Sequence, residues 1–373
     1  MSARSDRAAG ARSWLRHSAS GVALVLGLAL AAKLIAGALG GWAGSEKPLP
    51  VSPVLCAVLL GMLWRLGFGV AQKVNEGVRW ASGSLLKVGI ALVGLRLTLA
   101  GAGEVITLAA PVVAACICTA LLAGALLSRL LRVSLRLGIL LSVGTAVCGC
   151  TAIVALSPVI RARPEETGFA LVVVVALGCL GMLLYPSIAA HFFARAPTYA
   201  GLFLGTSIHD TSQVVGAALI YAQQYLAPDA LGAASLTKLL RNLSIAVLIP
   251  AAAWLVRSRA DASETPVIAQ RAARWDSFAL PGFVIWFVLL VALRSAGDAT
   301  FATPTVAAHW QQLITSTQLV SELLLICGMA AVGLGVSLKQ IAAIGWRPLV
   351  CGVAIAAIVG SCSLILTSLR FAV

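Results

Sequence analysis

Charged side chains are scarce in this chain. Of its 373 residues only 11% are Asp, Glu, Lys or Arg, whereas 60% are hydrophobic. A soluble domain typically carries about 25% charged residues. The polar surface available here is too small to cover even one compact globule. We therefore exclude a soluble enzyme and expect a protein embedded in a lipid bilayer.

Motifs for metal binding and disulfide formation are also missing. The nine cysteines form no CxxC pair, and no HExxH motif occurs. A structural zinc site needs four close ligands, whereas these cysteines lie in apolar runs, where they pack as small polarizable side chains. We expect no metal and no cofactor. An intramembrane enzyme that uses Cys148 or His209 is the least favoured alternative.

Long apolar runs dominate what is present. A bilayer core requires about 20 predominantly apolar residues per helix, and eleven segments meet this rule. The sequence predicts an all-α polytopic membrane protein of about 10–11 helices, with a basic tail at 1–19 and one transmembrane domain at 20–373. Polar connectors are expected at 257–277 and 295–318. The predicted segments are 21–39, 51–69, 84–100, 108–127, 137–160, 168–193, 201–221, 231–256, 278–293, 319–338 and 348–369.

Basic residues outnumber acidic ones by 27 to 13. With a cytoplasmic N-terminus, 17 of the 27 fall in inside segments and 5 in outside segments, as the positive-inside rule predicts. Because a nucleic-acid binder would cluster its charges on one face, we expect no nucleic acid and predict the inner membrane of a bacterium. One connector departs from this rule, since Arg161 and Arg163 both fall in an outside segment. Either the two glutamates beside them make this connector neutral, or segment 137–160 re-enters without crossing the membrane.

Two stretches repeat each other. Residues 85–99 align without gaps on 324–338, and eight of the fifteen positions are identical, including both glycines. The two predicted spans point in opposite directions. Duplicated halves of opposite orientation are typical of secondary transporters. The alternative is two unrelated helices that share a glycine-spaced packing face.

Two segments are predicted to interrupt their helices. Residues 144–151 and 205–213 both begin with Gly-Thr, and both place small polar residues where a lipid-facing helix would carry Leu. Broken helices in transporters expose backbone groups near the midplane, where substrates bind. Whether the two segments are equivalent stays open. The candidate site residues here are Thr145, Cys148, Thr206 and Ser207.

Ionisable residues in the spans are few. Asp210 is the one acid well inside a predicted span, and an ionised carboxylate there costs about 2.5–3.5 kcal/mol on insertion scales. His209 titrates near neutrality, and Gln213 follows one turn later. We favour a functional role for this group over a neutral His–Asp pair that only locks two helices.

The counter-charges are predicted on the eighth span. Lys238 and Arg241 lie three residues apart, so they share one helix face. Snorkelling toward an interface is the alternative, but Arg241 lies far from the ends of its span. Arg96, in the repeated third span, is a candidate for either role.

These motifs resemble one family, the YeiH-like bacterial inner-membrane proteins, often labelled sulfate exporters. The matching stretches run in order across nearly the whole chain, and the most specific is the element His209-Asp-x-x-Gln213-Val-Val. It implies inverted repeats and a fold similar to the cation/proton antiporter and bile-acid symporter superfamily. It also implies that the positions typical of the family are Arg96, Cys148, His209, Asp210, Gln213, Lys238 and Arg241.

The sequence thus predicts a secondary transporter, an exporter of a small anion such as sulfate or an organosulfur acid, and not an enzyme. Lys238, Arg241 and half-helix N-termini would hold the anion, while His209 and Asp210 couple it to a proton. The main alternative is a transporter with a cation bound at Asp210. A non-transporting sensor is a further alternative, although the short loops offer partners little surface. The expected partners are the bilayer, the solute and protons, and a homo-oligomer is allowed.

Overall fold

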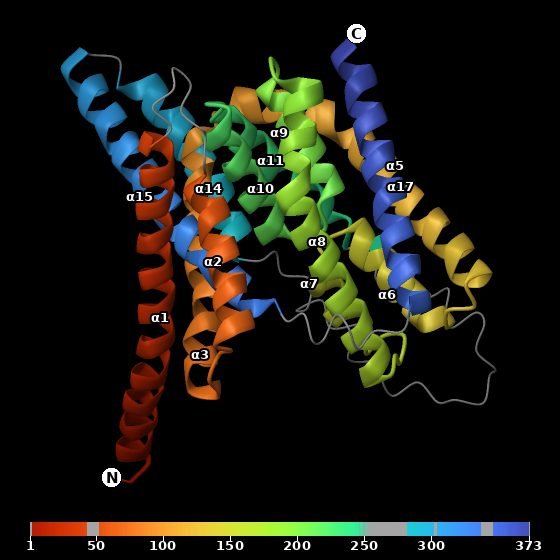
Figure 1. The fold of residues 1–373 in the computed structure, drawn as a ribbon. Helices are drawn as coiled ribbons and strands as arrows, with labels where there is room; N and C mark the ends of the chain where they lie inside the picture. Colours follow the sequence, from red (N-terminus) through yellow and green to blue (C-terminus); the bar gives the residue numbers. More distant parts are fainter. Residues whose placement is uncertain are drawn as a thin grey trace. The chain divides into compact units, whose positions relative to one another are not determined.

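The structure is a computed structural model that describes residues 2–42, 52–245, 247–248, 251, 282–301, 304–336 and 346–372. Within these residues every regular element is a helix (Figure 1). In the part of the chain that the structure describes, seven helical stretches are long and apolar enough to cross a membrane, so the predicted fold class, a polytopic all-α membrane protein, is confirmed. They are Ala19–Leu39, Val74–Arg96, Leu99–Leu130, Pro164–Phe193, Gly282–Thr300, Thr305–Gly335 and Trp346–Ala372.

Several predicted boundaries are wrong. The connector expected at 295–318 is helical over 295–300 and 304–318, because α14 (Gly282–Thr300) and α15 (Pro304–Gly335) extend into it. Asp298 accepts hydrogen bonds from Arg294 Nε (2.7 Å) and Trp310 Nε1 (2.9 Å), so polar groups on the helices satisfy one another beyond the apolar run. The connector at 257–277 and most of 246–256 lie outside the described residues.

The described residues form two compact units. Both are discontinuous in sequence, and the single domain expected at 20–373 stays a prediction. Unit 1 comprises residues 1–98, 222–227 and 286–338, and it contains α1 (Ser2–Trp42), α2 (Pro53–Gly67), α3 (Gln72–Trp80), η1 (Ala81–Leu85), α4 (Leu86–Val93), η2 (Gly94–Arg96), most of α14, and α15. Unit 2 contains α5 (Leu99–Leu130), α6 (Leu135–Ala146), α7 (Cys150–Leu156), α8 (Pro164–Phe193), α9 (Pro197–Ser207), most of α10 (Thr211–Gln224), α11 (Asp229–Leu243) and α17 (Trp346–Ala372).

The repeated stretches pack against each other in unit 1. A methyl group placed on Gly89 would lie 2.9 Å from Leu325 Cδ2, and one placed on Gly328 would lie 2.7 Å from Leu86 Cδ1. In the repeat, Gly89 corresponds to Gly328 and Leu86 to Leu325. The contact is therefore the same from both sides, as in a two-fold symmetric interface. An antiparallel, self-matching contact of this kind is compatible with the predicted duplication in opposite orientations.

In unit 2, α6 and α7 form a hairpin. Gly144 of α6 lies against Ile153 of α7, since a methyl group on Gly144 would come within 2.7 Å of the Ile153 side chain. Both outer ends meet the start of α8: Ser134 Oγ, before α6, donates to Glu166 Oε1 (2.5 Å), and the hydroxyl of Ser157, after α7, bonds to that of Thr167. The segment predicted at 137–160 thus enters and leaves at one end of the unit.

Helices α9 and α10 form a second hairpin at the other end of α8. Glycines in α9 pack on α11 in parallel, with Gly201 near the Ala230 carbonyl and Gly205 near Thr237. Because α9 and α11 start at the same level, α10 must return between them. Tyr221 Oη near the end of α10 accordingly donates to the Phe193 carbonyl at the end of α8 (3.2 Å). The segment predicted as a span at 201–221 is therefore a hairpin.

The turns of both hairpins fall where the sequence predicts helix breaks. Helix α6 ends at Ala146 and α7 begins at Cys150, with Gly149 in the left-handed region at φ +64°. A residue with a Cβ is strained at this φ, so glycine suits the turn. Helix α9 ends at Ser207 and α10 begins at Thr211. Both predicted interruptions are confirmed.

Candidate functional site

The turns of the two hairpins meet at the side chains of α11. We call this place the tip junction: residues 145–149, residues 206–210, Lys238 and Arg241. Lys238 is fully buried. Its Nζ donates to the carbonyls of Val147 (2.7 Å), Ile208 (3.1 Å) and His209. An ammonium has three donors, so the hairpin turns occupy all of them.

Arg241 binds the same two turns one helical turn further along α11 and is also fully buried. Its Nε donates to the Ala146 carbonyl (2.7 Å), and Nη2 donates to that of Thr145. Its Nη1 donates to the Thr206 and Ile208 carbonyls at 2.6 and 3.2 Å. The guanidinium fork therefore joins the ends of α6 and α9.

The acceptors of both cations are the last carbonyls of broken helices. The final carbonyls of a helix lack partners within the helix and carry the negative end of its dipole. Lys238 and Arg241 supply both the hydrogen bonds and the compensating charge. In the described part of the chain neither cation forms an ion pair with a carboxylate. The two side chains thus bind the same pair of hairpin turns from one helix, but their hydrogen-bond partners among the described residues are backbone carbonyls and not the Asp210 carboxylate.

Asp210 lies at the half-buried rim of the tip junction. Its Oδ1 accepts hydrogen bonds from the backbone N–H (2.9 Å) and the hydroxyl (2.5 Å) of Ser212, so it caps the N-terminus of α10. Its Oδ2 faces the first hairpin, 3.5 Å from where a methyl group on Gly149 would lie. One carboxylate thus contacts both hairpin turns.

His209 and Gln213 flank this carboxylate and are buried, with 3% and 2% of their surface exposed. The amide Nε2 of Gln213 donates to the Val175 carbonyl (3.0 Å) and to Cys179 Sγ (3.3 Å), both on α8. Gln213 fits there because Gly178 has no side chain: a methyl group would lie 1.8 Å from Gln213 Oε1.

Several buried polar atoms around the junction have no hydrogen-bond partner among the described residues. They are Thr145 Oγ1, His209 Nδ1, Gln213 Oε1, Thr237 Oγ1 and Asn242 Oδ1. Unpaired buried polar atoms are costly, at about 1–3 kcal/mol each, and most such groups in proteins are paired. They lie beside two buried cations and a half-buried acid, so the tip junction gathers polar groups that a water molecule or a polar solute would satisfy.

The remaining predicted site residues do not all contribute their side chains to the tip junction. Thr206 Oγ1 bonds back to the Leu202 carbonyl (2.7 Å) and to Ser363 Oγ of α17 (2.6 Å). Ser207 Oγ donates to the Phe203 carbonyl within α9 (2.6 Å). Their hydroxyls thus bond back into α9 and across to α17. Cys148 is buried in the first turn. Arg96 belongs to unit 1, whereas the tip junction is built wholly from unit 2.

The sequence also left contributors unrecognised. Four residues that were not predicted as site residues contribute to the tip junction or its hairpins: Ser212, Ser363, Gly149 and Gly178. Only two of them could have been identified from a sequence pattern. The spacing Asp210-x-Ser212 is typical of a helix N-cap, and Gly149 stands in a predicted break. Nothing in the sequence marks Gly178 or Ser363 among many similar glycines and serines. No three His, Cys, Asp or Glu side chains gather as metal ligands in the described part of the chain.

Comparison with known proteins places the chain in a family. Residues 20–352 match the family model described as conserved hypothetical protein 698. A UPF0324 membrane protein of Ralstonia nicotianae is 31% identical over 353 residues, which covers 92% of this chain and 91% of the relative. One of Bacillus cereus is 28% identical over 341 residues (89% of each), and one of Streptococcus pyogenes is 30% identical over 316 residues (84% and 89%). This chain therefore belongs to the UPF0324 membrane-protein family, the YeiH-like group that its motifs resemble.

Proposed function

We propose that this protein is a secondary transporter of a small anion, with the tip junction as its substrate site. The observation that carries the proposal is the meeting of two hairpin turns, from opposite ends of unit 2, at the buried side chains of Lys238 and Arg241. Broken helices that meet inside a membrane protein are typical of substrate sites in transporters.

The charge balance favours an anion. Two cations and one carboxylate give the tip junction a formal excess of one positive charge. The carbonyl ends of α6 and α9 are neutralised by Lys238 and Arg241, whereas α10 begins next to Asp210 with the half-buried residues Thr211 and Ser212. A helix N-terminus attracts negative charge. We therefore assign the anion to the rim beside Asp210, with the two cations as positioning residues behind it.

Asp210 is the proposed coupling group. When its carboxylate takes up a proton, it loses the charge that repels an anion at the α10 N-terminus. The binding of a proton and the binding of the anion then favour each other by linkage. We therefore propose that both are carried across the membrane in the same direction. His209 is the proposed route for the proton, because it is buried next to Asp210 in the chain and its Nδ1 has no hydrogen-bond partner among the described residues.

The hairpins also bear on membrane orientation. If neither hairpin crosses, Arg161 and Arg163 move to the inside and Arg195 moves to the outside. The distribution then becomes 18 basic residues inside against 4 outside, a sharper asymmetry than with every segment crossing. We propose a bacterial inner-membrane protein with a cytoplasmic N-terminus and two re-entrant hairpins.

A cation substrate is the second candidate, favoured by one observation. Gln213 Oε1 and Thr145 Oγ1 are oxygen ligands without partners among the described residues, and Asp210 adds a carboxylate. Oxygen donors of this kind suit a hard cation. The full burial of two positive charges beside them makes this arrangement less favourable than anion binding.

Reconstitution into liposomes tests the proposal. Uptake of radiolabelled sulfate is measured with pH gradients of either direction, for the wild type and for Asp210→Asn. Glu104→Gln, an exposed acid on α5, serves as the control. We expect sulfate flux driven by the proton gradient in the wild type and in Glu104→Gln. Asp210→Asn, which mimics the protonated acid, should transport sulfate without responding to the gradient.

Two results would contradict this assignment. A pH-driven flux that persists unchanged in Asp210→Asn removes the coupling role of that residue. Sodium-dependent stabilisation against thermal unfolding, together with the absence of any stabilising anion in a screen at two pH values, establishes the cation alternative. The screen relies on the fact that any ligand of the folded state raises apparent stability.

A further inference from the structure

A groove of about 360 Å³ lies between α5 and α17 of unit 2, away from the tip junction. Its lining residues are Pro111, Val112, Ala115, Leu366, Leu369 and Arg370. The two helices run antiparallel here, because Thr119 Oγ1 lies 3.4 Å from Cys362 Sγ while Pro111 and Arg370 line the other end. The volume is at the lower end of the range for small-molecule pockets, about 300–1,000 Å³.

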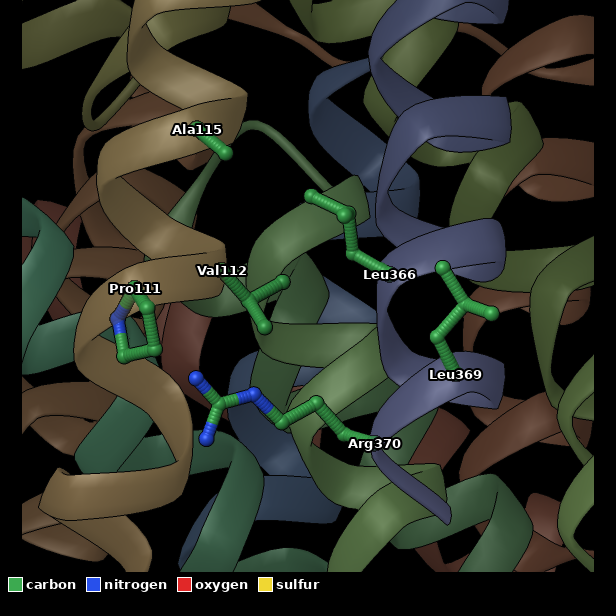
Figure 2. A pocket seen from close by; sticks show the side chains of 6 residues that line it. All are labelled: Pro111, Val112, Ala115, Leu366, Leu369 and Arg370. Atoms are coloured by element: carbon green, nitrogen blue, oxygen red, sulfur yellow. The ribbon is translucent and has the colours of Figure 1, made fainter. Parts of the chain in front are cut away.

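The groove has a single charged group at one end. Figure 2 shows the Arg370 side chain extending from α17 toward α5, next to Pro111 and Val112, with Leu366 further along the groove. Arg370 is exposed, and among the described residues no acid pairs with it. The other lining side chains are apolar. A polar solute would find one partner here and leave the rest of its groups unpaired, which excludes a second substrate site.

The position of the groove along α17 matches the layers of a bilayer. Trp346 and Arg370 stand near opposite ends of this membrane-spanning helix. At 1.5 Å per residue they are roughly 36 Å apart, against a thickness of about 40–45 Å for a bilayer with its headgroups. Trp and Arg both favour the interface. Arg370 is therefore at headgroup level, and Leu366, one turn deeper, is at the level of the acyl chains.

We propose that this groove binds an anionic phospholipid. The phosphate lies against the Arg370 guanidinium, which presents paired N–H donors to phosphate oxygens. The first part of an acyl chain lies along Val112, Ala115 and Leu366. The charge of Arg370 selects the anionic headgroup over a zwitterionic one, and the apolar groove selects a lipid over a free phosphate ester.

Native mass spectrometry of the full-length protein in detergent tests the proposal. Dissociation constants are measured for dioleoyl phosphatidylglycerol and dioleoyl phosphatidylcholine. Arg370→Gln removes the charge, Ala115→Phe fills the groove, and Arg347→Gln is the matched control, since it removes an exposed arginine at the other end of the same helix. Unfolding temperatures without added lipid establish that each variant is folded.

We expect at least a five-fold preference of the wild type for phosphatidylglycerol. Arg370→Gln should remove this preference, and Arg347→Gln should retain it. Ala115→Phe should weaken the binding of both lipids. The proposal is overturned if Arg370→Gln keeps the preference, or if Arg347→Gln loses it equally. It is also overturned if free glycerol phosphate competes as well as the lipid, because the groove then recognises a soluble anion. If Ala115→Phe folds poorly, Leu366→Ala takes its place and should weaken the binding of both lipids.

Discussion

Lys238 and Arg241 are buried cations whose hydrogen-bond partners, among the described residues, are all backbone carbonyls. Burying a charge is costly unless hydrogen bonds replace the lost water. Here the carbonyls at the ends of α6 and α9 provide that replacement, and the same carbonyls would otherwise be unpaired. The cations thus supply the hydrogen bonds that the carbonyls need, and the carbonyls replace the water that the cations lose. Removing a cation leaves the carbonyls unpaired, and moving the carbonyls away leaves the cation without hydrogen bonds.

Arg241→Met measures this mutual dependence. The substitution leaves the carbonyls of Thr145, Ala146 and Thr206 without a donor, at about 1–3 kcal/mol for each buried group. We expect a loss of at least about 3 kcal/mol in the free energy of unfolding, measured by thermal denaturation in detergent. Arg347→Met, at an exposed arginine, should change it by less than about 0.5 kcal/mol. Equal effects of the two variants would contradict this role.

Gly178 has a similar importance for Gln213. In Gly178→Ala the new methyl group would lie 1.8 Å from Gln213 Oε1, so the amide must move and lose its bond to Val175. We expect a destabilisation of about 1–3 kcal/mol in thermal denaturation. Gly168→Ala on the same helix, where nothing lies within 4 Å of the added methyl group, is the control. Adding Gln213→Ala to Gly178→Ala should recover part of the loss, since the two effects share one contact.

At this scale the sequence predicted which side chains are unusual, but not what they bind. Asp210, Lys238 and Arg241 stand out because charges are rare in apolar spans. Their hydrogen-bond partners could not be predicted, because these are backbone carbonyl oxygens, which every residue type has. The same holds for Gly178, whose importance depends on a neighbour 35 positions away in the sequence.

The hairpins are the main difference between the predicted and the observed elements. An apolar run of twenty residues has the length of a span whether the chain continues or turns back, so length cannot distinguish the two. Polar residues at 144–151 and 205–213 correctly predicted where the helices stop. The direction of the next helix depends on packing against α8 and α11, which the sequence does not display. The surplus of arginine at 161–163 was the one hint of a turn back.

Site-directed labelling tests the hairpins in the membrane. In a variant without native cysteines, Arg132→Cys and Arg161→Cys flank the first hairpin, and both should react with a membrane-impermeant maleimide from the same side. Arg195→Cys and Leu226→Cys flank the second and should react from the other side. Reaction of the first two from opposite sides would mean that 137–160 crosses the membrane. Each protein must keep its wild-type unfolding temperature to be counted.

For the whole molecule, the sequence predicted the fold class, which is confirmed, and a duplication, which stays a prediction. High apolar content and long runs sufficed for a polytopic helical protein, and eight identities in fifteen residues indicated the repeat. The compact units were not predicted, because each draws on distant parts of the chain. Contacts between residues far apart in sequence require the folded structure.

The symmetric contact in unit 1 predicts equal effects from equivalent substitutions. Gly89→Leu and Gly328→Leu insert a side chain into the same contact from its two sides, and each meets the leucine opposite at under 3 Å. We expect both to lower the free energy of unfolding by similar amounts, about 1–3 kcal/mol each. Gly335→Leu, where a methyl group has no neighbour within 4 Å, is the control. A large effect of only one of the pair would contradict the symmetry.

The contact between the repeats has a consequence for how the fold assembles. Between two separate subunits a self-matching contact of this kind would depend on protein concentration. Here one chain carries both halves, so the connecting residues set an effective concentration that dilution does not change. Cutting the chain between the repeats would convert the same pairing into one that weakens on dilution, and the two fragments would then assemble as subunits do.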